Sequence, residues 1–157
     1  ATNWRDTNNQ QRVTGTNFDI REVGRWGEAL VYQYLLLKYP NATVTWVNME
    51  NETTACYDIR IEDPQFTDDS ASNNGKEKGK CSHIVTTFIE VKTTRFDEVK
   101  TFDISLNEWE FASGKPPVHF DIYRVYNAGD PNRVRIQIIK DIYENVRSRS
   151  VRLCLSV

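Results

Sequence analysis

The spacing of apolar residues is the feature that most limits how this chain can fold. Residues 19–38 carry apolar side chains along one stripe at helical spacing, and Gly24 and Gly27 lie on or beside that stripe. Asp19 and Glu22 have the spacing of a capping box, and Pro40 marks the end of the helix. The small glycines predict that this helix approaches its neighbour closely.

Short β-prone runs separated by polar turns follow this helix. Ser105 and Glu108 have capping-box spacing and predict a second, short helix ending near Ala112. Alternation of helices and strands favours an α/β or α+β sheet with helices on its faces. We expect strands at residues 44–47, 56–61, 84–94, 101–106, 120–126 and 134–139, with a further strand from the tail 151–157.

Length and composition bound the domain organisation. The 157 residues fit one domain, and 39% hydrophobic with 11% aromatic content is enough for a packed core. We interpret residues 1–18 as a flexible lead-in and residues 19–157 as the domain. Residues 62–83, rich in Asp, Ser, Asn, Gly and Lys, predict an extended loop within it.

The cellular context is inferred from what the sequence lacks. Its apolar runs are shorter than the roughly 20 residues that cross a bilayer, so no membrane association is expected. The three cysteines are widely spaced and odd in number, which favours a reducing nuclear or cytoplasmic location. The chain starts without Met, which we interpret as a fragment of a larger protein.

Three charged residues stand within otherwise apolar strand patterns. Glu90 and Lys92 fall on one face of their strand, and Asp58 points away from the apolar residues of its own. Such groups are costly in a strand unless they pair or hold a metal. Two adjacent carboxylates raise each other's pKa, and Mg²⁺ or Mn²⁺ relieves that repulsion. The pattern predicts a metal-dependent hydrolytic site in which Lys92 positions water.

Glu28 is a candidate third carboxylate, because it lies at the border of the apolar stripe of the first helix. Alternatively it is a surface residue paired with Arg21 or Arg25. Glu90 and Lys92 alone would equally fit a solvent-facing ion pair. Glu108 is interpreted as the capping partner of Ser105.

The order of these motifs resembles the family of C-terminal domains of the plant protein NO VEIN. The resemblance covers roughly residues 20–140 and rests on Gly24-Arg-Trp-Gly-Glu28, Val44-Thr-Trp-Val-Asn48, Tyr57-Asp58-Ile, Phe88-Ile-Glu90-Val-Lys92, Phe102-Asp-Ile-Ser105, Asn107-Glu-Trp109-Glu-Phe-Ala112 and Tyr123-Arg-Val-Tyr-Asn127. That family looks like a branch of the PD-(D/E)XK nuclease-like superfamily, which implies a restriction-endonuclease-like central mixed β-sheet flanked by helices.

The resemblance also implies roles for the four charged residues. Asp58 and Glu90 would bind metal, Lys92 would be the catalytic lysine and Glu28 the accessory helix carboxylate. Tyr57 stands where the superfamily has Pro before the first Asp. The segment of residues 62–83 is longer than the hairpin usual in the family. The resemblance implies that such domains lie at the C-terminal end of large, ATPase-like proteins. We therefore expect the rest of such a larger protein as a partner of this domain.

Basic residues supply the candidate contacts to nucleic acid. Candidate contacts to a phosphate backbone are Arg95, Lys100, Lys76, Lys78 and Lys80. The three lysines at positions 76–80 also fit a solvated loop that contacts no ligand. A net charge of −2 counts against a broad phosphate-binding surface. Two hypotheses stay open: a Mg²⁺-dependent nuclease, or a catalytically inactive nuclease-fold module that binds nucleic acid or a protein partner.

Overall fold

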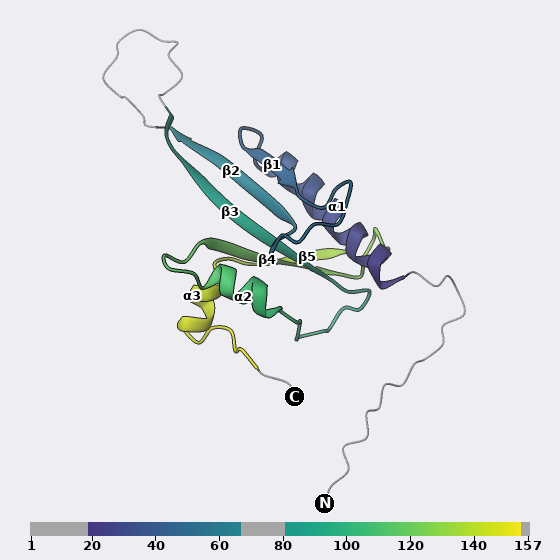
Figure 1. The fold of residues 1–157 in the computed structure, drawn as a ribbon. Helices are drawn as coiled ribbons and strands as arrows, with labels where there is room; N and C mark the ends of the chain where they lie inside the picture. Colours follow the sequence, from purple (N-terminus) through teal and green to yellow (C-terminus); the bar gives the residue numbers. More distant parts are fainter. Residues whose placement is uncertain (1–18, 67–80, 155–157) are drawn as a thin grey trace, which may run out of the picture.

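A five-stranded sheet with helices on both faces forms the centre of the molecule (Figure 1). The computed structural model describes residues 19–66 and 81–154. In chain order its elements are α1 (Ile20–Lys38), β1 (Thr43–Trp46), β2 (Ile59–Phe66), β3 (Cys81–Thr93), α2 (Leu106–Ala112), β4 (His119–Tyr126), β5 (Arg135–Ile139) and α3 (Ile142–Arg147).

The sheet is mixed, and its strand order follows the chain from β1 to β5. The β3–β4 pair is parallel, and the other three neighbouring pairs are antiparallel. A parallel pair needs a crossover connection, and the segment containing α2 supplies it. The expected α/β class, with a mixed sheet between helices, is confirmed.

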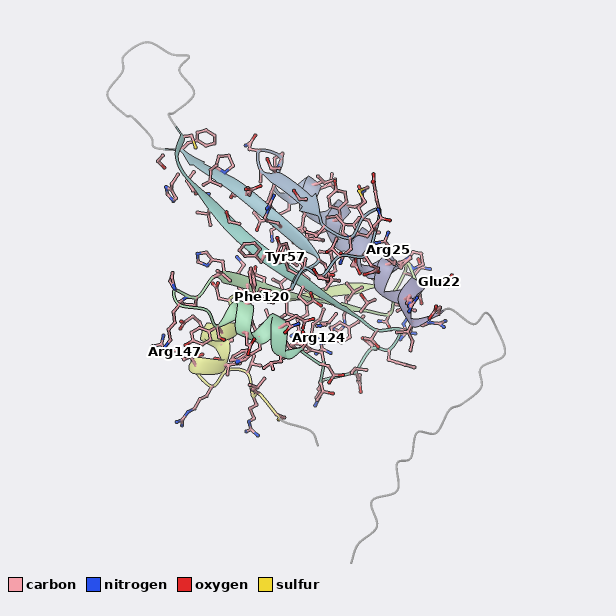
Figure 2. The ribbon with its side chains drawn as sticks, in the orientation of Figure 1. Glu22, Arg25, Tyr57, Phe120, Arg124 and Arg147 are labelled. Atoms are coloured by element: carbon pink, nitrogen blue, oxygen red, sulfur yellow. The ribbon has the colours of Figure 1, made fainter. Side chains whose placement is uncertain are left out.

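The two faces of the sheet carry separate cores because side chains alternate along each strand. On one face Ile59, Ile89 and Val91 pack against Val31 and Leu35 of α1. The other face carries a cluster beneath α2 and α3, made of Phe88, Phe120, Ile122, Ala112 and Ile142. Figure 2 shows Phe120 and Arg124 on the side of the sheet that faces α2, with Arg25 on α1 across the sheet.

The first helix forms where the sequence predicts it. The Asp19 side chain accepts a hydrogen bond from the Arg21 N–H, and Tyr39 ends the helix before Pro40. Gly27 allows the close approach, because a Cβ there would lie 1.9 Å from Oγ1 of Thr93. Gly24 has no such role, since a Cβ there would meet nothing within 4 Å.

The β2–β3 hairpin is longer than the sequence predicted. Residues 62–66 and 81–83 were expected in a loop, but Asp63 pairs with Val85 and Pro64 with Ile84. Pro64 is tolerated because the last β1 pair is Thr43 with Glu62, which leaves β2 with a partner on one side only. At its other end β2 begins at Ile59 rather than at residue 56.

The strand expected at residues 101–106 is wrong. Residues 101–105 form an irregular segment leading into α2, and Arg124 binds the carbonyl oxygens of Val99, Lys100 and Thr101 where that segment begins. The tail strand is not seen at residues 151–154, and residues 155–157 lie outside the described residues. Helix α3 was not predicted.

Some predictions fall on segments that the structure does not describe. The lead-in at residues 1–18, most of the expected loop and Lys76, Lys78 and Lys80 lie outside the described residues. Within residues 19–66 and 81–154, no helix combines the length and the apolar character that crossing a membrane requires.

Candidate active site

Asp58 stands immediately before β2, where β3 continues past the end of β2 and keeps only β4 as a strand partner. Its backbone still joins the sheet: its N–H donates to the Ile89 carbonyl at 2.9 Å, and its carbonyl accepts from Val47 N–H at 2.8 Å. Its carboxylate Oδ2 accepts the Val91 N–H at 2.8 Å. The side chain thus takes the place of a strand partner, which fixes the carboxyl group beside β3.

Lys92 is held between two carboxylates on the face of the sheet that α2 covers. Its Nζ lies 2.9 Å from Oε1 of Glu90 and 3.0 Å from Oε2 of Glu108. The three side chains are 20%, 12% and 16% exposed, respectively. The predicted common face of Glu90 and Lys92 is therefore confirmed, and the group is a half-buried ion cluster rather than a solvent-facing pair.

The environment of Glu90 and Asp58 favours one shared proton. Burial, followed by the charge of Asp58, raises the pKa of Glu90 to about 8, against the lowering effect of Lys92. Burial also raises the pKa of Asp58, although the Val91 N–H, the charge of Lys92 and the neighbouring Glu90 side chain act in the opposite direction. The pair therefore carries less than two negative charges at neutral pH unless a cation compensates.

Lys92 keeps its proton in this setting. Burial alone would lower the pKa of its ammonium, but the charges and hydrogen bonds of Glu90 and Glu108 outweigh that effect and raise the pKa. Lys92 consequently acts as a fixed positive charge and hydrogen-bond donor, not as a neutral base.

Glu28 approaches the cluster from α1, on the opposite side of the sheet. Its Oε2 accepts a hydrogen bond from Trp46 Nε1 at 2.7 Å. Burial and then the charge of Asp58 raise the pKa of Glu28 to about 7, while Trp46 and Arg25 act in the opposite direction. Glu28 is thus coupled to Asp58, and its firm contact is with an indole rather than with Arg21 or Arg25.

Arg124 supports the segment that joins β3 to α2. It pairs with Lys92 in the parallel register and is 5% exposed. Its guanidinium donates to three carbonyl oxygens of residues 99–101 and lies 4.9 Å from the Phe102 ring centroid and 4.8 Å from that of Tyr126. By holding this segment, Arg124 helps to place α2 and its Glu108 over Lys92.

The sequence favoured a capping role for Glu108, and the structure shows two roles. Oε2 of Glu108 accepts the Ser105 N–H at 2.9 Å, which completes the capping box, and the same oxygen contacts Lys92. The capping box was visible in the sequence. The resemblance implied that Glu108 or Glu110 of this helix could join the active site, but the contact with Lys92 itself depends on how α2 lies on the sheet.

A hard cation fits the carboxylate pair better than a zinc ion does. Within residues 19–66 and 81–154, no three His, Cys, Asp or Glu side chains are grouped so that they could hold a metal ion. Mg²⁺ uses one or two protein carboxylates and keeps several waters, whereas zinc takes three or four protein ligands. Asp58 and Glu90 offer oxygen donors, and burial raises the pKa of both, so a cation beside them would favour their charged forms.

The predicted basic residues are not gathered around this cluster. Arg95 follows β3 and lines a cleft between α1 and the turn after β4. Lys100 is exposed, and its backbone carbonyl is bound by Arg124. A second cavity, of about 190 Å³, is lined by His119, Asp121 and their neighbours and lies apart from Asp58 and Glu90.

Together the fold and the cluster define a small α/β domain with a buried carboxylate–lysine site on a mixed sheet. A model of the family "Protein NO VEIN, C-terminal" matches residues 27–139, and the chain belongs to this family.

Two relatives carry the same domain. Protein NO VEIN of Arabidopsis thaliana is 34% identical over 108 residues, which are 67% of this chain and 3% of that protein. Protein NO VEIN-LIKE of the same plant is 35% identical over 96 residues, 60% of this chain and 12% of that protein. The chain thus spans a small part of each relative's length. No solved structure matches it significantly.

Proposed function

We propose that this domain is a Mg²⁺-dependent phosphodiester hydrolase of the PD-(D/E)XK type, acting on DNA or RNA within a larger intracellular protein. The observation that carries the proposal is the convergence of Asp58, Glu90 and Lys92 at one place on a mixed sheet. The restriction-endonuclease-like arrangement is compatible with the observed sheet and its flanking helices.

Each residue has a role that follows from its contacts. Asp58 and Glu90 would hold Mg²⁺ or Mn²⁺, with Glu28 tuning the charge of Asp58 from the α1 side. A divalent ion bound there supplies Lewis-acid stabilisation of the developing phosphate charge. The protonated Lys92 orients a water and donates to the scissile phosphate, and Glu108 fixes the position of its ammonium.

Chain cleavage measured on labelled single-stranded and duplex oligonucleotides tests the proposal. We expect hydrolysis in Mg²⁺ or Mn²⁺ and none with a chelator. Asp58→Asn, Glu90→Gln and Lys92→Ala should each lower the rate by about a hundredfold or more. Glu62→Gln is the matched control, because Glu62 is a partly exposed carboxylate paired with Arg60 on the same sheet. Cleavage that survives in Asp58→Asn and Glu90→Gln would exclude this site.

One observation favours a second function, a catalytically inactive nuclease-fold module. Both oxygens that contact Lys92 are carboxylates of the protein itself, so the lysine already has its charge partners. Such a module would bind nucleic acid or a protein partner without divalent cations. Calorimetric titration with Mg²⁺ and Mn²⁺ distinguishes the two functions. The hydrolase must bind one of these ions, and Glu90→Gln should abolish that binding, whereas the inactive module needs no affinity for either ion.

A further inference from the structure

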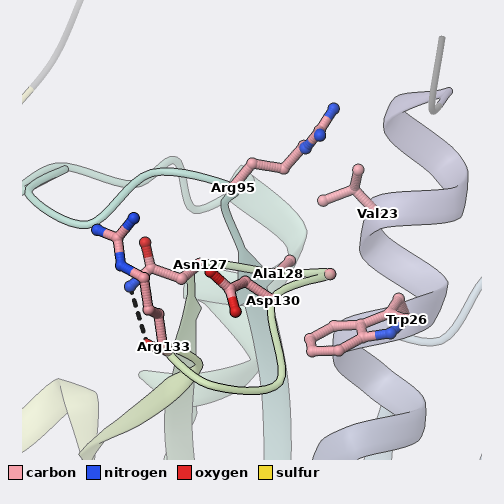
Figure 3. A pocket seen from close by; sticks show the side chains of 8 residues that line it. Val23, Trp26, Arg95, Asn127, Ala128, Asp130 and Arg133 are labelled. Carbon is pink, nitrogen blue, oxygen red and sulfur yellow. Dashed lines mark hydrogen bonds between the residues drawn. The ribbon is translucent and has the colours of Figure 1, made fainter. Parts of the chain in front are cut away.

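A cleft of about 330 Å³ opens at the carboxyl ends of the two parallel strands, β3 and β4. Arg95 lies two residues beyond the end of β3, and the turn containing Asn127 and Arg133 follows β4. Trp26, from the second turn of α1, closes the other side. Figure 3 shows α1 with Val23 and Trp26 on one side of the cleft and the turn with Asp130 and Arg133 on the other.

The lining combines two cations, an aromatic ring and one carboxylate. Arg95 and Arg133 contribute guanidinium groups, which recognise phosphate oxygens in a bidentate manner. Trp26 contributes an indole, the side chain on which nucleobases stack. Asp130 contributes acceptor oxygens for N–H or O–H groups of a base or sugar. Phosphate, base and hydrogen-bond donors occur together in a nucleotide.

Arg133 can turn to a ligand at little cost. It is 64% exposed, and its ion pair with Asp97 is long, at 3.9 Å. Asp97 is already bound by Arg135, whose Nε lies 3.0 Å from Oδ1 of Asp97. Long exposed ion pairs of this kind contribute little to stability.

The turn is held by hydrogen bonds within itself, which favours a cleft that is formed before a ligand arrives. Asn127 and Gly129 have positive φ angles of 54° and 86°, and Nδ2 of Asn127 donates to the Arg133 carbonyl at 3.0 Å. Oδ1 of Asp130 accepts the Asn132 N–H at 3.0 Å. A site of this kind loses little conformational entropy on binding.

The cleft shares two elements with the proposed catalytic cluster, but it opens on the α1 side of the sheet, whereas Lys92 lies on the side that α2 covers. Arg95 is three residues beyond Lys92, which is at most about 10 Å of extended chain. Trp26 and Glu28 are two residues apart on α1. Elements that carry the cluster therefore also carry the cleft.

We propose that this cleft binds one unpaired nucleotide of the nucleic-acid strand that the carboxylate–lysine cluster cleaves. Arg95 and Arg133 hold its phosphate, Trp26 stacks on its base and Asp130 accepts hydrogen bonds from its donor groups. The inference rests on the proposed function and narrows the substrate class to strands with at least one unpaired nucleotide.

Titration of the ¹⁵N-labelled chain with adenosine 5′-monophosphate, without metal, tests the cleft alone. We expect saturable shifts of the Trp26 indole N–H and the Gly129 amide, with adenosine binding about tenfold more weakly because it lacks the phosphate. Arg133→Gln should weaken binding by a similar factor. Arg147→Gln is the matched control, because Arg147 is 68% exposed on α3 and also paired with one carboxylate. Unmoved signals, or equal losses in both variants, would overturn the proposal.

Oligonucleotides then separate this proposal from the hydrolase proposal. A single-stranded 8-mer should shift the same two signals, a fully paired hairpin should not, and Asp58→Asn should leave these shifts unchanged. Binding without cleavage removes the hydrolase and keeps the nucleotide site. The opposite result is cleavage with a KM that Arg133→Gln leaves unchanged and no shift of the Trp26 indole N–H signal. That result would support the hydrolase proposal and exclude the nucleotide site.

Discussion

Lys92 Nζ lies 3.0 Å from Oε2 of Glu108, and the same oxygen accepts the N–H that opens α2. One carboxylate oxygen therefore caps the N-terminus of α2 and pairs with a lysine on the neighbouring strand β3. Because both contacts share an atom, the position of α2 on the sheet and the charge state of the cluster are coupled.

The shared oxygen of Glu108 predicts a graded series of variants. Glu108→Gln retains a capping side chain, since Gln also serves at this position, but removes the negative charge. Glu108→Ala removes both, and should lower the free energy of unfolding by about 2 kcal/mol or more through the lost cap and ion pair. Urea denaturation should give the order wild type, Glu108→Gln, Glu108→Ala. Equal stability of the last two would show that the cap contributes nothing.

Lys92→Met should be strongly destabilising because it leaves two half-buried carboxylates without their cation. Loss of one partner of a buried ion pair costs about 3–5 kcal/mol. Adding Glu90→Gln should restore part of that loss, because the remaining repulsion is smaller. The control is Arg60→Met, whose pair with Glu62 is 39% and 36% exposed and should cost less than about 1 kcal/mol. Similar losses in the two single variants would contradict the burial of the cluster.

The stability of the metal-free domain should fall as pH rises from about 5 to 8. The folded chain holds a proton on Glu90 up to a pKa of about 8, whereas the unfolded chain releases it near 4.5. Across that interval the folded state binds more protons, so each increase in pH favours unfolding. Thermal unfolding of Glu90→Gln should show a flatter pH profile, while Glu144→Gln, an exposed control on α3, should follow wild type.

Mg²⁺ should oppose this loss if the pair binds it. At pH 8, millimolar Mg²⁺ should raise the melting temperature of wild type and leave that of Glu90→Gln unchanged, because only the intact pair gains a ligand. A melting temperature that responds equally in both proteins would show that Mg²⁺ acts elsewhere.

Two glycines of α1 provide a test of helix–sheet packing. Gly27→Ala should destabilise by about 1–3 kcal/mol, because the new Cβ would overlap Oγ1 and Cβ of Thr93 at 1.9 and 2.9 Å. Gly24→Ala meets nothing within 4 Å and should stabilise the helix by about 0.5–1 kcal/mol. Chemical denaturation of the two variants gives the comparison. The same sign of effect in both would contradict the close crossing of α1 and β3.

Local patterns sufficed for much of the fold. Helix α1, the capping box of α2 and the strands β4 and β5 follow from spacing and capping signals that lie within a few residues. Alternation along β3 also placed Glu90 and Lys92 on one face, because strand geometry dictates it. The strand expected at residues 101–106 was mispredicted, and the start of this segment is bound instead by the side chain of Arg124, more than 20 residues further along the chain.

By itself the sequence determined which charged residues would intrude into apolar strands and which helices and strands would carry them. Only the tertiary structure decided which of these charges meet. Asp58 is fixed by the Val91 N–H, Glu28 by the Trp46 indole and Lys92 by Glu108, and each of these contacts joins segments at least 16 residues apart. Patterns of neighbouring residues report which way a side chain points, but the partner it reaches depends on how separate elements pack.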